Sequence, residues 1–140
     1  MAKRVYLDSN VFISLNLQEI GGDFSGLFIQ AQLFFNQARK NNDVVVVSKL
    51  ALGEIQKKTS LSEEDIFSYL SEIGVSVELV VFDRDNLEFN RFMKMGIHTA
   101  DALHIALAIK AKCDCIVTFN IKDFEKAGKY LRAVAPAEFT

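Results

Sequence analysis

The sequence predicts a single-domain, three-layer α/β/α fold with a mostly parallel central sheet, and three observations predict it. Short β-rich runs alternate with longer stretches of helical periodicity along all 140 residues, which is typical of strand–helix–strand units. Residues 44–47 are four consecutive valines between polar residues, the pattern of a parallel strand covered on both faces. No composition shift marks a linker, and half of the residues are apolar, so residues 1–140 can form one core.

In the first half of the chain, apolar periodicity and capping residues predict each element. The alternation around Tyr6 places Val5 and Leu7 on one face of a strand and Tyr6 on the other. Ser9 and Asn10 are residue types that cap helices, so we expect a helical turn to begin there. Beyond it, apolar residues recur every three or four positions. The expected elements are a strand at 3–8, a helical turn at 9–13, a turn at 21–23, a helix at 24–41, a strand at 44–47 and a helix at 48–57.

The second half continues the same alternation. Ser60 and Glu63 have the spacing of a capping box, which opens a helix. The stretch that begins at Thr99 is apolar almost all round, so it predicts a central rather than a surface helix. Gly96 ends the amphipathic helix before it. The expected elements are helices at 62–73, 84–95, 99–112 and 123–128, strands at 75–82 and 115–119, and an edge strand at 131–135.

Composition excludes several classes of protein. Eighteen acidic residues against sixteen basic ones give a net charge of −2, which excludes a protein that coats nucleic acid by charge alone. A metal-dependent nuclease can still be acidic, because bound cations reverse the sign of their site. No apolar stretch is long enough to span a bilayer, and we expect a cytoplasmic protein without a membrane partner. Cys113 and Cys115 are too few for a zinc site, and neighbours on a strand point to opposite faces, so both are expected to be buried filler.

Four acidic residues lie beside apolar runs: Asp8, Glu54, Asp101 and Asp123. In parallel sheets, ligands bind at the carboxyl ends of the strands. Asp8 ends the first strand and Asn120 follows a late one, so the two meet at one edge if those strands are neighbours. Gathered carboxylates are the ligands of a hard divalent cation such as Mg²⁺ or Mn²⁺. We therefore expect a shared metal site.

Two of these acids also have purely structural interpretations. Asp8 could cap the following helix, although Ser9 and Asn10 can both do so. Glu54 shares a helix face with apolar residues, where a carboxylate is costly unless it is paired or bound to metal. The structural alternative for Glu54 is an ion pair on the helix flank with Lys57 or a neighbouring lysine, Lys58.

The polar residues later in the chain also have both structural and functional interpretations. Asp101 lies in the first turn of its helix, where the helix dipole favours a carboxylate, while Thr99 can serve as the N-cap and leave Asp101 to face a cation. Asp123 can be the N-cap of the short helix at 123–128. His104 lies one turn after Asp101 and is interpreted as a hydrogen-bonded core residue, and His98 as a loop residue of unassigned role.

Four segments in order carry a resemblance to a known family: a strand ending in LDSNVFI, a helix carrying LALGEI, then TADALHIALA, and finally IVTFNIKDF. Together they resemble the PIN domain, especially the single-domain VapC-type ribonuclease toxins. The resemblance covers essentially the whole chain. It implies a Mg²⁺- or Mn²⁺-dependent ribonuclease in which a few acids hold one or two ions.

The resemblance also implies residue roles. Asp8, Glu54 and Asp101 are similar to the first, second and third acids of the family. The fourth acid usually follows a Thr or Ser by two residues, and here Asn120 takes that place, with Asp123 as the candidate substitute. Ser9 and Thr118 match the small hydroxyl residues that usually line the pocket.

The same resemblance implies an RNA substrate, an antitoxin protein as partner and a homodimer. One alternative is a non-catalytic PIN-like module that binds RNA or protein, which Asn120 favours because it brings no charge. Another is a flavodoxin-like phosphate binder, but no Gly-rich loop follows Asp8. RNA cleavage with Mn²⁺ compared with EDTA distinguishes the nuclease from the binding module.

Overall fold

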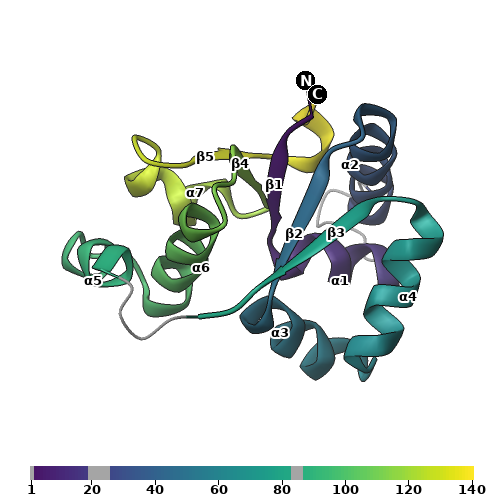
Figure 1. The fold of residues 1–140 in the computed structure, drawn as a ribbon, viewed down its shortest axis with the longest axis horizontal. Coiled ribbons are helices and arrows are strands. Elements are labelled where there is room, and N and C mark those ends of the chain that lie inside the picture. Colours follow the sequence, from purple (N-terminus) through teal and green to yellow (C-terminus); the bar gives the residue numbers. More distant parts are fainter. Residues whose placement is uncertain (1, 19–25, 83–86) are drawn as a thin grey trace.

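A computed structural model of the chain describes residues 2–18, 26–82 and 87–140. Its centre is a five-stranded sheet in the order β3-β2-β1-β4-β5, and every pairing between these strands is parallel. Helices cover both faces of the sheet (Figure 1), so the predicted three-layer α/β/α fold is confirmed. The strands are β1 (Arg4–Leu7), β2 (Val44–Ser48), β3 (Ser76–Val80), β4 (Cys115–Val117) and β5 (Arg132–Val134).

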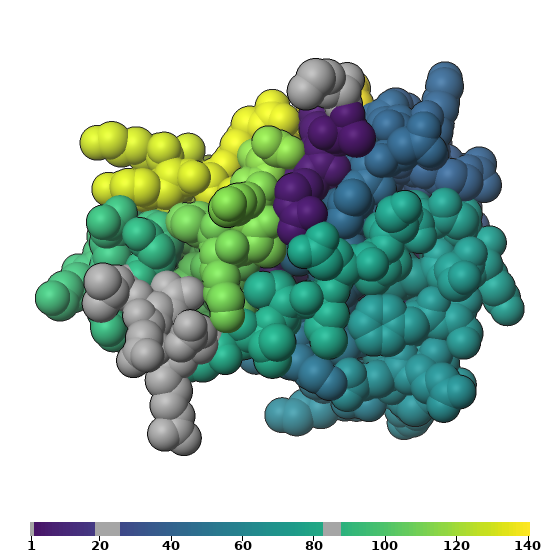
Figure 2. Space-filling view, in the orientation of Figure 1, coloured from purple at the N-terminus to yellow at the C-terminus, as the bar shows by residue number. Residues whose placement is uncertain are grey.

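Helices α1 to α4 lie on one side of the sheet, and α5 and α6 lie on the other with α7 beside them (Figure 1). In the space-filling view of the same orientation, side chains fill the space between these ribbons (Figure 2). The helices are α1 (Ser9–Leu17), α2 (Leu27–Asn41), α3 (Lys49–Thr59), α4 (Glu63–Ile73), α5 (Leu87–Lys94), α6 (Thr99–Lys110) and α7 (Ile121–Phe124), followed by the short 3₁₀ turns η1 (Glu125–Ala127) and η2 (Pro136–Glu138).

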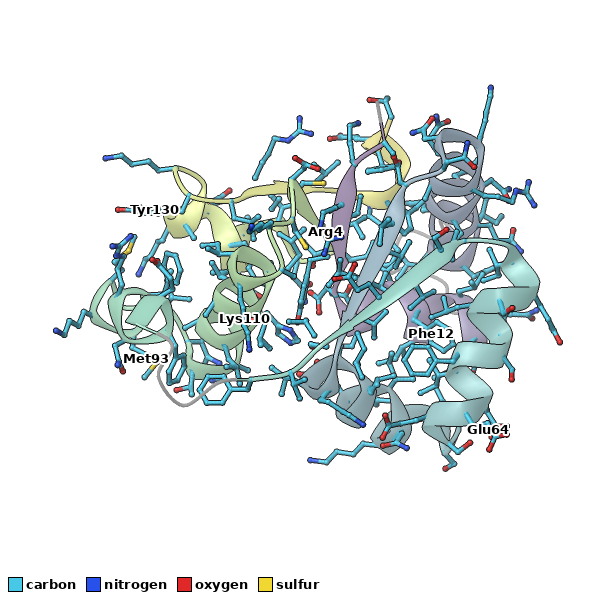
Figure 3. All side chains as sticks on the ribbon, viewed as in Figure 1. Arg4, Phe12, Glu64, Met93, Lys110 and Tyr130 are labelled. Carbon is cyan, nitrogen blue, oxygen red and sulfur yellow. The ribbon has the colours of Figure 1, made fainter. Side chains whose placement is uncertain are left out.

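Buried hydrophobic side chains form two clusters, one on each side of the sheet, because successive side chains of a strand point to opposite faces. Val5 and Leu7 pack with α1 to α4, whereas Tyr6 packs with α5, α6 and the segment around Phe124. The predicted division of β1 between two faces is therefore confirmed. On the first side, the labelled Phe12 lies between α1 and α4, where its ring meets that of Tyr69 edge-on at 5.3 Å between centroids (Figure 3).

Most predicted elements are present, with shifts at their ends. The capping box that begins α4 is formed by Ser62 and Asp65, not by Ser60 and Glu63. Ser60 instead ends α3 in the left-handed conformation, with φ of 62°. The expected turn at 21–23 and the expected starts of two helices at 24 and 84 lie outside the described residues. Within the described part of the chain, no helix combines the length and the apolar character that crossing a bilayer requires.

The strand order positions the functional site. Because β1 lies between β2 and β4, the carboxyl ends of these three strands share one edge of the sheet. Leu7 pairs with Val117 in the register of β1 and β4, so the residues that follow them, Asp8 and Thr118, emerge side by side. Side chains two residues apart share a face of a strand, which places Asp8 on the same side as Tyr6, toward α6.

Candidate metal centre

The first strand and the late strand, β1 and β4, are neighbours in the sheet, and the residues that follow them, Asp8 and Thr118, are in contact. The Thr118 hydroxyl donates a hydrogen bond of 2.7 Å to Asp8 Oδ2. Thr118 is fully buried, and Asp8 is 7% exposed. Burial raises the pKa of the Asp8 carboxyl, the charge of Glu54 adds to this, and His104 and Thr118 oppose it. A buried carboxylate of this kind needs a compensating partner.

The capping interpretation of the Asp8 segment is corrected by the structure. Ser9 and Asn10 lie inside α1, and Asp8 itself occupies the N-cap position. The Asp8 side chain nevertheless makes no capping hydrogen bond. The side chains of Ser9 and Asn10 instead reach across the site, to Glu54 and Thr118 respectively. The polar cluster after β1 therefore organises the edge of the sheet rather than the helix end.

Glu54 reaches the same edge from α3. Its Oε1 accepts a hydrogen bond of 2.8 Å from the Ser9 hydroxyl and lies 3.0 Å from His104 Nε2. The structural alternative, an ion pair on the helix flank with Lys57 or Lys58, is not found among the described residues. Burial by itself raises the pKa of the Glu54 carboxyl, but the contacts with His104 and Ser9 and the charge of Lys57 lower it below its ordinary value. Glu54 is therefore an anion at neutral pH.

His104 is the residue whose part in the site the sequence did not reveal. It is 2% exposed, as the core interpretation expected. It also belongs to a group with Asp8 and Glu54 in which one ligand atom from each residue lies within 4.8 Å of the others. The signal in the sequence was its position one helical turn after Asp101, because that spacing places both side chains on one face of α6.

Asp101 and Asp123 extend the site toward α7 without joining that group of three. Burial raises the pKa of Asp101, and the negative charges of Asp123 and Asp8 raise it further. With His98 and Lys122, the two acids line a cavity of about 210 Å³. Asp101 therefore lies close enough to Asp8 for the charge of Asp8 to raise its pKa. Among the expected acids, however, only Asp8 and Glu54 have ligand atoms within 4.8 Å of each other in the group with His104.

Two helix-capping predictions in this region are wrong. The N-cap position of α6 is His98 rather than Thr99. That of α7 is Asn120, and Asp123 lies inside this short helix with an exposed side chain. The backbone N–H of Asn120 donates to Thr118 Oγ1 over 3.0 Å, which fixes the start of α7 beside Asp8. Asn120 and Asp123 are exposed and line a neighbouring hollow, so both can face a ligand over the site.

The donor set fits a hard divalent cation. Within the described residues, no Lys or Arg side chain forms an ion pair with Asp8, Glu54 or Asp101. In the same part of the chain, both hydrogen bonds to Glu54 converge on Oε1, which leaves Oε2 without a donor. The raised pKa values of Asp8 and Asp101 and the unshared oxygen of Glu54 suit a hard divalent cation, which prefers oxygen ligands.

A comparison with family models gives a match to the PIN domain, which covers residues 5–130. This range includes every site residue described above. No match was found among curated proteins.

Proposed function

The chain belongs to the PIN domain family, and on that premise we propose that it is a divalent-metal-dependent ribonuclease that hydrolyses RNA phosphodiester bonds. PIN domains are generally nucleases that depend on divalent metal ions. The observation that carries the proposal is the meeting of Asp8 and Glu54, whose ligand atoms lie within 4.8 Å together with that of His104. Asp8 and Glu54 come from positions 46 residues apart in the chain, and a shared cation explains why two anions are held together.

The metal ligands in this proposal are Asp8, Glu54 and Asp101. A bound Mg²⁺ or Mn²⁺ supplies positive charge that polarises the phosphoryl group and activates the attacking water. Thr118 orients Asp8 through its hydroxyl, and the Ser9 hydroxyl holds one oxygen of Glu54. The rigid edge of the sheet thus presents carboxylate oxygens in fixed positions, which is the main contribution of a protein to metal-assisted hydrolysis.

Substrate phosphates have cationic partners close to Asp101. Lys122 and Lys126 line the same cavity as Asp101 and Asp123. Their ammonium groups can pair with RNA phosphates that approach the metal ligands, because phosphate contacts supply most of the sequence-independent affinity. Lys49, in contrast, forms an ion pair of 2.6 Å with Glu63 and is not assigned to substrate.

A cleavage assay on mixed RNAs tests the proposal, with Mn²⁺ in one arm and EDTA in the other. We expect cleavage with Mn²⁺ only, and a loss of about 100-fold or more for Asp8→Asn, equivalent to ~2.7 kcal/mol of the several that a bound metal contributes. Glu64→Gln is the matched control, because Glu64 is an exposed acid on α4. Cleavage that is equal in EDTA, or unchanged in Asp8→Asn, would overturn the proposal.

The alternative is a PIN-like module that binds RNA without cutting it. The observation that favours it is Asn120, an uncharged and exposed residue at the position where the family usually has an acid. If wild-type protein binds RNA in Mn²⁺ and leaves it intact, while Asp8→Asn binds equally well, this alternative replaces the nuclease.

The toxin role is part of the same proposal and rests on the similarity of the four sequence segments to VapC-type toxins. A toxin of this kind is neutralised by an antitoxin protein and commonly forms a homodimer. Growth arrest on expression of the wild type, relieved in Asp8→Asn, is the expected result. Normal growth with an active ribonuclease would separate the nuclease activity from the toxin role, and sedimentation measures the oligomeric state.

A further inference from the structure

A continuous line of buried hydrogen bonds lies behind Glu54. Ser48 Oγ is 2.7 Å from Tyr6 Oη, and Tyr6 Oη is 2.6 Å from His104 Nδ1. His104 Nε2 then contacts Glu54 Oε1 at 3.0 Å. Ser48 and Tyr6 are fully buried, and His104 nearly so. Ser48, Tyr6 and His104 come from β2, β1 and α6, so the line joins three elements to one carboxylate oxygen on a fourth, α3.

The chemistry of the contacts decides where the imidazole proton lies. Glu54 is an anion and only accepts, so an unprotonated Nε2 at 3.0 Å would set two lone pairs against each other. Nε2 therefore carries a hydrogen and donates it to Glu54. On the other side of the ring, Ser48 Oγ accepts from the Ala51 backbone N–H, and its own hydroxyl hydrogen is free to go to Tyr6. Tyr6 can then donate to His104 Nδ1 when that nitrogen carries no hydrogen.

Two consistent arrangements remain, and both have the same consequence. In one, the neutral ring accepts from Tyr6 through Nδ1, and in the other, a charged ring donates from both nitrogens. In each of them His104 Nε2 donates to Glu54 and has no lone pair for a cation. The proximity of Asp8, Glu54 and His104 alone suggests three ligands, but within this group the hydrogen bonds leave only Asp8 and Glu54 able to bind a cation.

We propose that His104, oriented by Tyr6 and Ser48, is a positioning residue that fixes Glu54 with Oε1 anchored and Oε2 presented to the metal. The inference rests on the proposed function in taking Glu54 as a metal ligand. The side chain of Glu54 is 35% exposed on its helix, so without an anchor it loses conformational freedom when a cation binds. Hydrogen bonds from Ser9 and His104 to Oε1 restrict the Glu54 side chain before a cation binds, so this loss of freedom does not weaken binding.

The tautomer is measured first, on the metal-free protein. The chain has only two histidines, so long-range ¹H–¹⁵N spectra give two ring signal sets, and the set lost in His104→Leu belongs to His104. We expect a protonated Nε2. A neutral ring protonated at Nδ1 alone would overturn the inference, whatever the outcome for metal binding.

Metal affinity is measured next, with Mn²⁺ alone as the probe in calorimetric titrations. We expect the dissociation constant to rise about 10- to 100-fold in His104→Leu, as for other residues that orient metal ligands. His104→Gln should restore most of the affinity, since its amide N–H can replace the Nε2 donor. Tyr6→Phe should weaken binding as well, while the matched change Tyr69→Phe on α4 should not. Thermal unfolding in EDTA shows which variants are folded.

Pulsed electron paramagnetic resonance of the Mn²⁺ complex distinguishes a positioning role from direct ligation. We expect no nitrogen modulation from a coordinated imidazole in the wild type. Such a signal that disappears in His104→Leu would overturn the inference and leave the nuclease proposal standing, as would unchanged affinity in a folded His104→Leu protein. If the wild type does not bind Mn²⁺ at all, the proposed function fails, and this inference fails with it.

Discussion

Thr118 and Asp8 are separated by 110 positions in the chain, and the Thr118 hydroxyl donates to Asp8 Oδ2 over 2.7 Å. The contact exists because β1 and β4 are neighbours whose last residues, Leu7 and Val117, are in register. Thr118 Oγ1 also accepts from the backbone N–H of Asn120. One buried hydroxyl therefore joins the carboxylate at the end of β1 to the start of α7.

Removing this hydroxyl should destabilise the protein and weaken its site. Thr118→Val keeps the side-chain shape but leaves a buried carboxylate oxygen and a backbone N–H without their partner, a loss of about 1–3 kcal/mol. Urea unfolding in EDTA measures it. Thr118→Ser retains the hydroxyl and is the control, with a smaller loss. Equal stability of Thr118→Val and wild type would show that the hydrogen bond does not support Asp8.

Divalent ions should stabilise the folded protein. The anions at Asp8 and Glu54 repel each other in the metal-free state, and ligand binding to the folded chain adds about 2.7 kcal/mol at a concentration 100 times the dissociation constant. We therefore expect Mg²⁺ or Mn²⁺ to raise the melting temperature, and EDTA to reverse the rise. Asp8→Asn and Asp101→Asn should reduce the rise, whereas Glu64→Gln should keep it. A melting temperature that is independent of metal in every variant would contradict the shared site.

Asn120→Asp should increase metal affinity. The substitution adds a carboxylate two residues after Thr118, at the position where the family usually has its fourth acid. Added negative charge near Asp8 and Asp101 also increases repulsion in the metal-free state, so stability in EDTA should fall while the rise on Mn²⁺ addition grows. Calorimetric titration and thermal unfolding measure the two effects. Asn90→Asp on α5 adds the same charge at an exposed position, and it should change neither.

The cap of α4 should be worth about 1 kcal/mol. Ser62 Oγ accepts from the Asp65 backbone N–H at 3.0 Å, and Asp65 returns a contact of 3.2 Å to the Ser62 backbone. Ser62→Ala removes the first of these bonds and should destabilise the protein by that amount in urea unfolding. Ser60→Ala tests the capping box expected from the sequence, and we expect it to change stability by less than about 0.5 kcal/mol. A larger loss of stability in Ser60→Ala than in Ser62→Ala would show that Ser60 is the cap.

Both cysteines should be unreactive in the folded protein. Burial raises the pKa of the Cys113 thiol to about 12, and burial raises that of Cys115 too. Since the thiolate is the reactive form, alkylation at pH 8 should be slow until the chain is unfolded in urea. A thiol whose pKa is raised by folding stabilises the fold below pH 9, and this contribution is lost as the pH rises toward 12. The expected burial is confirmed for Cys115, whereas Cys113 is only partly buried. Cys113→Ser separates the two thiols, and rapid labelling of the native protein would contradict their raised pKa values.

The individual strands and helices, and the faces that they bury, could be predicted from the sequence. The alternation of Val5, Tyr6 and Leu7 gave the two faces of β1, and the valine run gave a strand buried on both sides. The apolar stretch after Thr99 gave a central helix. These signals lie within a few residues of one another, so side-chain periodicity is enough to detect them. Cap positions were harder to predict, because several polar residues near a helix end can each accept hydrogen bonds from the same backbone N–H groups.

The sequence by itself also placed Asp8 at the end of β1 and Glu54 on the helix that follows β2, and so determined that both acids belong to segments that come directly after strands of the sheet. Only the tertiary structure decided their partners. Tyr6 meets His104 across 98 positions and His104 meets Glu54 across 50, and such contacts depend on strand order and on which helix covers which face. Hydrogen bonds act over about 3 Å, so a residue's role changes with packing that no local pattern encodes.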